Sequence, residues 1–150
     1  YTGILSIFSV LASHGETIEI YEDGQQSRDF VHVDDVVNTI YFSILEHNTP
    51  LYMNVGTGTP TSVIDVAKSI NKFFKNNDNL EMSNLFRQGD IRHNFADISL
   101  LGDKSTKFLT FSKGIAELLE EIKPRLQNEH SSYLKSRDEA IKSGILKHAK

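Results

Sequence analysis

The chain has 150 residues, of which 39% are hydrophobic and 24% charged, a composition typical of one soluble globular domain with a core of its own. The net charge of −4 at pH 7 and the pI near 5.8 argue against a protein that binds the phosphate backbone of nucleic acids. The absence of cysteine excludes disulfide bonds and thiolate metal sites, and it fits a reducing cytoplasm. No apolar run approaches the ~20 residues that a membrane span needs.

The first third of the chain predicts a helix, two short strands and a second helix. Residues 4–13 carry too many apolar side chains for one helix face, so we expect this helix to be buried on most sides. A strand at residues 18–21, a glycine turn and a second strand at residues 30–33 predict a hairpin. Asp34 is typical of an N-cap, and the apolar spacing after it predicts a helix to about residue 46.

The middle of the chain predicts a strand, a glycine loop and a capped helix. Residues 51–55 are typical of a short strand, and Gly-Thr-Gly at 56–58 starts a loop. Ser62 begins the string Ser-Val-Ile-Asp, which resembles a capping box, so a helix is expected to start there. Residues 80–86 are predicted to form another strand. The inward face of the helix is predicted to consist of Val63, Val66, Ala67, Ile70 and Phe74.

Two more helices are predicted toward the end of the chain. Thr110 is expected to cap a helix that runs to residue 122, and Pro124 is expected to end it. From residue 131 onward the spacing predicts an amphipathic helix. The alternation of strands and helices predicts an α/β fold. The chain begins without an initiator methionine or the basic region of a signal peptide, so we expect it to be part of a longer protein.

Three stretches of sequence resemble the motifs of one enzyme family. Residues 21–36 contain Tyr-Glu-Asp-Gly-Gln-Gln-Ser-Arg-Asp-Phe-Val-His-Val-Asp-Asp-Val. Residues 52–67 contain Tyr-Met-Asn-Val-Gly-Thr-Gly and Thr-Ser-Val-Ile-Asp-Val-Ala, and residues 87–98 contain Arg-Gln-Gly-Asp-Ile-Arg-His-Asn-Phe-Ala-Asp-Ile. In this order they resemble NAD-dependent nucleotide-sugar epimerases and dehydratases, which are extended short-chain dehydrogenases. The resemblance covers roughly residues 1–122 and points most to UDP-sugar 4-epimerases.

The resemblance implies that the chain is the C-terminal, substrate-binding portion of such an enzyme. The helix after Asp34 and the strand at 51–55 would be the last helix and strand of a Rossmann-like domain. Residues 1–123 are therefore predicted to be the substrate-binding portion, and residues 124–150 a C-terminal helical tail. The resemblance further implies an isomerase of carbohydrate metabolism and polysaccharide biosynthesis that works in the cytoplasm as a homodimer.

Arg28 and Arg87 are the predicted ligands of a diphosphate. An arginine presents a planar fork of N–H donors that matches phosphate oxygens, and two adjacent phosphates suit two such clamps. The resemblance implies the same role, because the matching arginines of the family hold the diphosphate of the sugar nucleotide. The alternative is that Arg28 forms a surface ion pair with Asp29 or Asp23.

Asp90 and Tyr21 complete the predicted substrate site. An ionised aspartate only accepts hydrogen bonds, which suits the two hydroxyls of a ribose, and the resemblance implies this role for Asp90. The resemblance also implies that the ring of Tyr21 lies against the nucleotide base. The alternative for Asp90 is a turn residue that follows Gly89, and the alternative for Tyr21 is a side chain that only packs within its strand.

No catalytic residue and no metal ligand is predicted. No two of the six histidines stand four residues apart with a carboxylate partner, so a metal role is rejected for His32 and His93. His32 is interpreted as a hydrogen-bonded structural residue. The Gly-Thr-Gly loop lacks the third glycine of a dinucleotide fingerprint, because Thr61 stands there, and it is interpreted as a turn that could line the substrate cleft.

Two motifs that the family's chemistry needs are absent from the sequence. There is no Gly-x-x-Gly-x-x-Gly loop after a first strand, and none of the five tyrosines is followed by a lysine four residues later. We therefore expect the cofactor, NAD, to be bound by an N-terminal part outside this chain, and the isolated chain to be inactive. The expected partner is a nucleotide-sugar substrate, with no nucleic acid and no membrane.

Two positions depart from the family pattern. Glu22 replaces a glycine in the turn after the first strand, so this backbone is expected to be shaped differently or to place a negative charge near the nucleotide. Leu85 stands where a proline usually precedes the Arg-x-Gly-Asp motif. The reaction stays open at this point, because a nucleotide-sugar dehydratase or reductase would carry the same motifs, and a non-catalytic binding module could keep the same fold.

Overall fold

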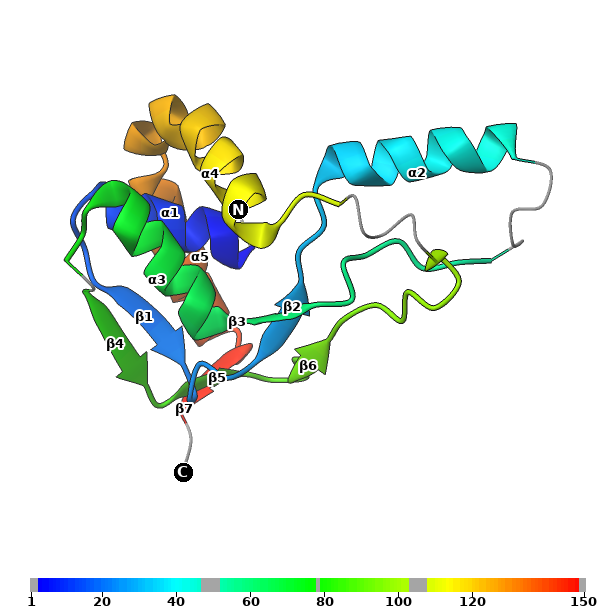
Figure 1. The fold of residues 1–150 in the computed structure, drawn as a ribbon. Helices are drawn as coiled ribbons and strands as arrows, with labels where there is room; N and C mark the ends of the chain where they lie inside the picture. Colours follow the sequence, from blue (N-terminus) through cyan, green and yellow to red (C-terminus); the bar gives the residue numbers. More distant parts are fainter. Residues whose placement is uncertain (1–2, 47–51, 78, 103–107, 149–150) are drawn as a thin grey trace.

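The computed structural model describes residues 3–46, 52–77, 79–102 and 108–148. These residues form an α/β fold in which short strands lie beside a cluster of helices (Figure 1). One helix, α2, extends away from this cluster (Figure 1). The predicted fold class is confirmed.

The core lies between two helices and a pair of parallel strands. Strand β1 (Ile18–Tyr21) pairs with β4 (Leu80–Ser83), and helices α1 (Ile4–Ser13) and α3 (Val63–Phe74) contact each other beside them. The helix predicted at residues 4–13 is confirmed, and its buried residues span 8–12. The side chains with no exposed surface include Ile18, Ile20, Val66, Ala67 and Ile70.

The predicted hairpin is wrong. Strand β2 (Ser27–Asp29) does not pair with β1; it lies between the antiparallel β3 (Pro60–Ser62) and the parallel β6 (His93–Asn94). The turn after β1 is held by the start of α3, because the Ile64 amide donates to the Gly24 carbonyl at 3.1 Å. Because α3 holds this turn, the chain leaves it in a direction that does not bring β2 alongside β1. The second strand forms at residues 27–29 and not at the predicted residues 30–33.

Helix α2 (Val33–Leu45) begins at a different cap from the predicted one. The N-cap is His32, whose ring Nδ1 accepts a hydrogen bond from the Asp34 backbone amide at 3.3 Å. Asp34 lies in the first turn, where its negative charge still favours the helix dipole. The prediction of Asp34 as the cap is therefore wrong, whereas the interpretation of His32 as a hydrogen-bonded structural residue is confirmed.

Helix α3 begins as its sequence predicts. The Ser62 hydroxyl accepts from the Asp65 amide at 3.2 Å and donates to the Asp65 carboxylate at 2.6 Å, which satisfies a free N–H of the first turn. Val66, Ala67 and Ile70 are completely buried. The capped start and the predicted inward face are both confirmed.

The two other predicted strands come out differently. The strand predicted at 80–86 is divided at Asn84 into β4 and β5 (Leu85–Arg87). Leu51 lies outside the described residues, and residues 52–55 are not a strand. A strand is stable only beside a hydrogen-bonded neighbour, and none of the described strands pairs with residues 52–55.

The end of the chain contains a strand that the sequence did not predict. Helix α4 (Phe111–Ile122) starts after Thr110, which occupies the cap position without a side-chain cap bond. A 3-10 helix, η2 (Lys123–Asn128), replaces the α-helix at Pro124. Helix α5 (His130–Lys142) and strand β7 (Leu146–His148) follow, and β7 pairs antiparallel with β5. In the described part of the chain, none of these helices has the length and apolarity that a membrane crossing requires.

The apolar face of α2 is exposed. Only Thr39 is buried in this helix, whereas Ile44 is 77% exposed. Figure 1 shows α2 lying apart from α1, α3 and α4, so those helices leave its far end uncovered. The large apolar side chains that it exposes are Val33, Val37, Ile40, Tyr41, Phe42, Ile44 and Leu45.

The 150-residue chain, purified alone, is expected to bind a hydrophobic dye and to self-associate, because contiguous exposed apolar surface favours association. The double variant Ile40→Lys/Ile44→Lys should reduce both effects while keeping the helix, since lysine is a good helix former. Dye fluorescence and sedimentation velocity measure the two effects. Leu134→Lys, at an exposed apolar position of α5, is the control. A wild-type chain that is strictly monomeric and binds no dye would contradict the expectation.

Candidate functional site

The four predicted substrate residues line one cavity of about 570 Å³. Tyr21 ends β1, Arg28 is the middle residue of β2, Arg87 ends β5, and Asp90 follows the turn after β5. Tyr21, Arg28 and Arg87 reach the cavity from three different strands, and Asp90 reaches it from the turn that follows Arg87. Their roles stay predictions, but their convergence on one cavity is a feature of the fold.

Arg28 is held by groups other than the two carboxylates suggested by its sequence neighbours. Its Nη2 donates to Asp90 Oδ1 at 2.7 Å, and its Nη1 donates to the Ser27 and Arg92 carbonyls at 2.8 and 3.2 Å. The alternative of a surface pair with Asp29 or Asp23 is therefore wrong. The pair that forms lies at the cavity and joins two of the four predicted residues.

Glu19 and Glu22 also line the cavity, and each of them pairs with an arginine. Arg137 donates to Glu19 from both Nε and Nη2, at 3.1 and 2.9 Å. Arg92 lies 3.2 Å from Glu22 and also pairs with Asp23. One guanidinium is thus shared between Glu22 and Asp23, and it offsets the negative charge of Glu22 only in part.

Arg87 is different from these arginines. Among the described residues, no carboxylate lies within ion-pair distance of its guanidinium. It is positioned by a tight turn in which the Asp90 amide donates to the Arg87 carbonyl and Gly89 takes a φ of 80°. Arg87 thus presents to the cavity a guanidinium that none of the described carboxylates neutralises, and this favours an anionic ligand.

Glu22 stands where the family pattern has a glycine, and it adopts a left-handed backbone conformation that is typical of glycine. Its φ is 55°, which a residue with a Cβ rarely adopts. The Glu22 amide donates to the Leu85 carbonyl at 3.0 Å, so the turn is tied to β5. Leu85 itself is buried at the start of β5, where it pairs with His148. Neither departure from the family pattern therefore breaks the strands around the cavity.

The Tyr21 hydroxyl stays protonated at neutral pH. Burial raises its pKa most, the negative charge of Glu19 raises it further, and Arg137 and Arg87 oppose the shift. A neutral phenol donates a hydrogen bond and presents an aromatic ring, which suits binding to a ligand.

Asp29 is a functional candidate that the sequence did not single out. Its carboxylate accepts four hydrogen bonds: from the Thr57 amide and hydroxyl at 3.0 and 2.5 Å, from the Gly58 amide at 2.9 Å, and from the Ala96 amide at 3.2 Å. Burial works against its charge, but these bonds outweigh burial and lower the pKa of Asp29. The one available signal was its position next to Arg28 within a family motif.

The Gly-Thr-Gly loop wraps around this carboxylate. A Cβ on Gly56 would lie 2.6 Å from both Ala96 and the Asp29 carboxylate, so only glycine fits there. Gly58 has a φ of 67°. The interpretation as a turn is confirmed. Gly56 lines a separate cavity of about 600 Å³ that Arg28 also borders, and not the cavity of the four predicted residues.

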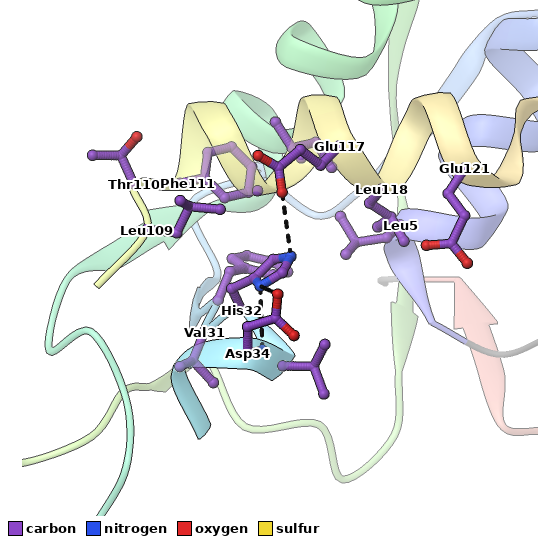
Figure 2. Close-up of a pocket in the computed structure, with 14 residues that line it drawn as sticks. Leu5, Val31, His32, Asp34, Leu109, Thr110, Phe111, Glu117, Leu118 and Glu121 are labelled. Carbon is purple, nitrogen blue, oxygen red and sulfur yellow. Dashed lines mark hydrogen bonds and ion pairs between the residues drawn. The ribbon is translucent and has the colours of Figure 1, made fainter. Parts of the chain in front are cut away.

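His32 lies in a further cavity of about 480 Å³, which Figure 2 shows. Its ring nitrogens lie 3.7 Å from Asp34 and 3.7 Å from Glu117 of α4. His93 Nδ1 lies 2.9 Å from the Ser27 hydroxyl. In the part of the chain that the structure describes, no group of three histidine, aspartate or glutamate side chains could hold a metal ion.

Comparisons with known proteins show which family this chain is similar to. Residues 1–56 match the model of the NAD-dependent epimerase/dehydratase family. The dTDP-L-rhamnose 4-epimerase of Burkholderia thailandensis is 37% identical over 100 residues, which cover 66% of this chain and 27% of that protein. The resemblance to this family is confirmed.

Solved structures of the family share the fold. The UDP-glucose 4-epimerase of Thermotoga maritima, solved with UDP-glucose, is 25% identical with a TM-score of 0.67, over 83% of this chain and 40% of that one. The UDP-N-acetylglucosamine 4-epimerase of Methanobrevibacter ruminantium, solved with UDP-N-acetylmuramic acid, is 27% identical with a TM-score of 0.70, over the same shares. The chain thus spans 27 to 40% of the length of these relatives.

Asp29→Asn is expected to lower the free energy of unfolding by about 1–3 kcal/mol, because an amide –NH₂ would face the N–H donors that the carboxylate accepts from. The folded-state pKa of Asp29 lies below the unfolded value near 3.9, so its contribution is present above that pH and is lost as pH falls through the folded pKa. Urea unfolding of variant and wild type from pH 7 to 3 measures the difference.

Asp138→Asn, at an exposed position of α5, is the matched control and should change stability little at any pH. A difference between Asp29→Asn and wild type that stays constant down to pH 3 would show that the charge of Asp29 is not what stabilises the loop.

Proposed function

We propose that this chain is the substrate-binding portion of an NAD-dependent nucleotide-sugar epimerase. In this proposal Arg28 and Arg87 hold the diphosphate of the sugar nucleotide, Asp90 bonds the ribose hydroxyls, and the ring of Tyr21 lies against the base. The observation that carries the proposal is that these four side chains line one cavity, three of them from separate strands and Asp90 from the turn after β5. The cavity has the several-hundred-Å³ size usual for sites of small organic ligands.

The charges around the cavity support an anionic ligand. Three carboxylates at the cavity are each paired with an arginine, whereas Arg87 has no described carboxylate partner. Arg28 uses Nη2 on Asp90, and a phosphate can take the remaining N–H donors of its fork or displace that carboxylate. Asp90, once freed from Arg28, can accept from a hydroxyl of the same ligand. Breaking the pair between Arg28 and Asp90 would thus free Arg28 to bind phosphate and Asp90 to bind the ribose hydroxyls.

The residues of this chain do not fit NAD. The sequence has neither a Gly-x-x-Gly-x-x-Gly loop nor a Tyr-x-x-x-Lys pair. In the family the cofactor supplies transient oxidation of the sugar and return of the hydride, and no such step is assigned to residues of this chain. Its residues bind and orient the substrate, and NAD binding belongs to another part of the protein.

An epimerase is favoured over the alternatives by the relatives. The UDP-glucose 4-epimerase of Mycolicibacterium smegmatis is 37% identical over 68 residues, and the two solved structures compared above are also 4-epimerases of UDP-sugars. A nucleotide-sugar dehydratase is the second candidate, because a dTDP-glucose 4,6-dehydratase has the same fold with a TM-score of 0.66. A homodimer, a cytoplasmic location and a place in polysaccharide biosynthesis remain predictions.

Arg28→Ala and Arg87→Ala are each expected to weaken UDP and UDP-sugar binding about ten- to hundredfold, because a charge-assisted hydrogen bond contributes roughly 1.5–3 kcal/mol. Arg→Lys at either position should restore only part of the loss, since a point charge does not reproduce the bidentate fork. The measurement is calorimetric titration of the full natural protein that contains these residues. Arg125→Ala, at an exposed position of η2, is the control. If all three alanine variants bind UDP and the UDP-sugar with equal affinity, Arg28 and Arg87 are structural residues and not ligands of the diphosphate.

The 150-residue chain by itself is expected to show no epimerase turnover and no saturable NAD binding, because both motifs of the cofactor site are absent from it. Product analysis after incubation with UDP-glucose and NAD, together with fluorescence titration of NADH, tests this. Turnover or specific NAD binding by the purified chain would contradict the proposal that another part of the protein binds NAD. The full natural protein is the positive control.

A further inference from the structure

The cavity of the predicted substrate residues has one wall from outside the family motifs. Tyr133 of α5 lines it together with Arg28 and Arg87. None of the three motif stretches contains Tyr133, and the family resemblance ends near residue 122. Helix α5 therefore contributes a side chain to the site that the motifs do not account for.

A second cavity, lined by residues of α5 and β7, adjoins the first. It has a volume of about 460 Å³ and shares Tyr21, Arg87 and Tyr133 with the first but lacks Arg28 and Asp90. Ser136 and Arg137 of α5 and Leu146 of β7 line this second cavity. A ligand whose phosphates lie between the two arginines thus has an aromatic compartment on the Arg87 side.

The tail is tied to the strands that carry the site. Strand β7 pairs with β5, with Leu146 opposite Arg87, and the Gln88 amide donates to the Ile145 carbonyl at 3.0 Å. Arg137 joins α5 to Glu19 of β1 through two hydrogen bonds to the same carboxylate oxygen. The tail is therefore hydrogen-bonded to Glu19, which lies two residues before Tyr21, and to Gln88, which follows Arg87.

The chemistry of Tyr133 suits binding and not proton transfer. Burial raises its pKa to about 12, and the neighbouring Tyr21 adds to the shift. A general base works best with a pKa near the operating pH, so this phenol remains protonated. Its ring is a flat apolar surface shared by the two cavities, and aromatic faces are what a planar heterocyclic base stacks on.

We propose that Tyr133 is a substrate-contacting residue that packs against the nucleoside base, so that the segment from η2 to β7 forms the nucleoside end of the binding cleft. This rests on the proposed function, because the diphosphate clamp sets which end of the substrate points toward α5. Arg137 is a positioning residue in this arrangement, since it acts through Glu19. The segment after Pro124 is then part of the substrate site.

The test separates the base from the phosphates. The full natural protein is titrated with UDP, dTDP, ADP and inorganic pyrophosphate, which has no base. Tyr133→Ala should weaken the best-bound nucleoside diphosphate about tenfold while leaving pyrophosphate unchanged, because base–aromatic stacking is lost and the clamp is kept. Tyr133→Phe should stay within about twofold of wild type, since the ring is retained. Arg28→Ala should weaken both classes of ligand.

Lys135→Ala, at an exposed position of the same helix, is the matched control. Circular dichroism melting checks folding, and Tyr133→Leu, which keeps apolar bulk but not a flat ring, replaces Tyr133→Ala if that variant unfolds. Arg137→Met should give a smaller loss for nucleotides, again without a change for pyrophosphate.

Three outcomes decide the matter. Tyr133 variants that bind every nucleotide as tightly as Lys135→Ala, while Arg28→Ala binds less tightly, overturn this inference and leave the proposed function intact. An equal loss for UDP and pyrophosphate in Tyr133→Ala also overturns it, because the effect would then act through the clamp. A wild-type protein that binds none of the three nucleotides would refute the proposed function itself.

Discussion

The carboxylate of Asp29 holds together the chain segments on which the site depends. It accepts hydrogen bonds from Thr57 and Gly58 of the glycine loop and from Ala96 beyond β6. Successive side chains of a strand point to opposite faces, so a fixed Asp29 orients Arg28 toward the other side of β2. Arg28 is directed at the cavity because its neighbour is anchored away from it. Ionised Asp29 is therefore a structural requirement of the proposed clamp.

The elements predicted correctly from the sequence carry their signals locally. The Ser62 hydroxyl and Asp65 lie within one turn, and the inward stripe of α3 follows from spacing alone. The hairpin was wrong because the partner of β1 is β4, about sixty residues further along the chain, and no local pattern encodes that pairing. His32 was missed as a cap because aspartate caps helices far more often, whereas an imidazole does so only when Nδ1 is free to accept.

The residues of the site likewise divide into those with a local sequence signal and those whose position depends on distant parts of the chain. The arginines, Asp90 and Tyr21 could be predicted because each stands in a motif, and the cavity that they share adds the spatial evidence. Asp29 was treated only as a possible ion-pair partner, since its four donors come from residues 28 and more positions away. Tyr133 could not be predicted as a site residue at all. Its place depends on β7 pairing with β5, and a three-residue strand has too short a pattern to predict.

Strand β5 links the clamp to the tail. Arg87 ends this strand, and Leu146 of β7 pairs with that same residue, so a shift of the tail displaces the backbone that carries the clamp. The Glu22 amide bonds the start of β5, and the Glu22 backbone is held at a positive φ that is unfavourable for its side chain. Such a strained turn persists only where the surrounding hydrogen bonds hold its backbone in place.

The coupling between clamp and tail works in both directions. If a diphosphate on Arg87 favours the position of β5 that β7 also favours, each must strengthen the other by the same free energy. Two carboxylates that line one cavity form arginine pairs, Glu19 with Arg137 of the tail and Asp90 with Arg28 of the clamp. A nucleotide that spans the cavity would bridge both pairs. The tail is thus best understood as one side of the cleft, with its stability and the affinity for nucleotide determined together.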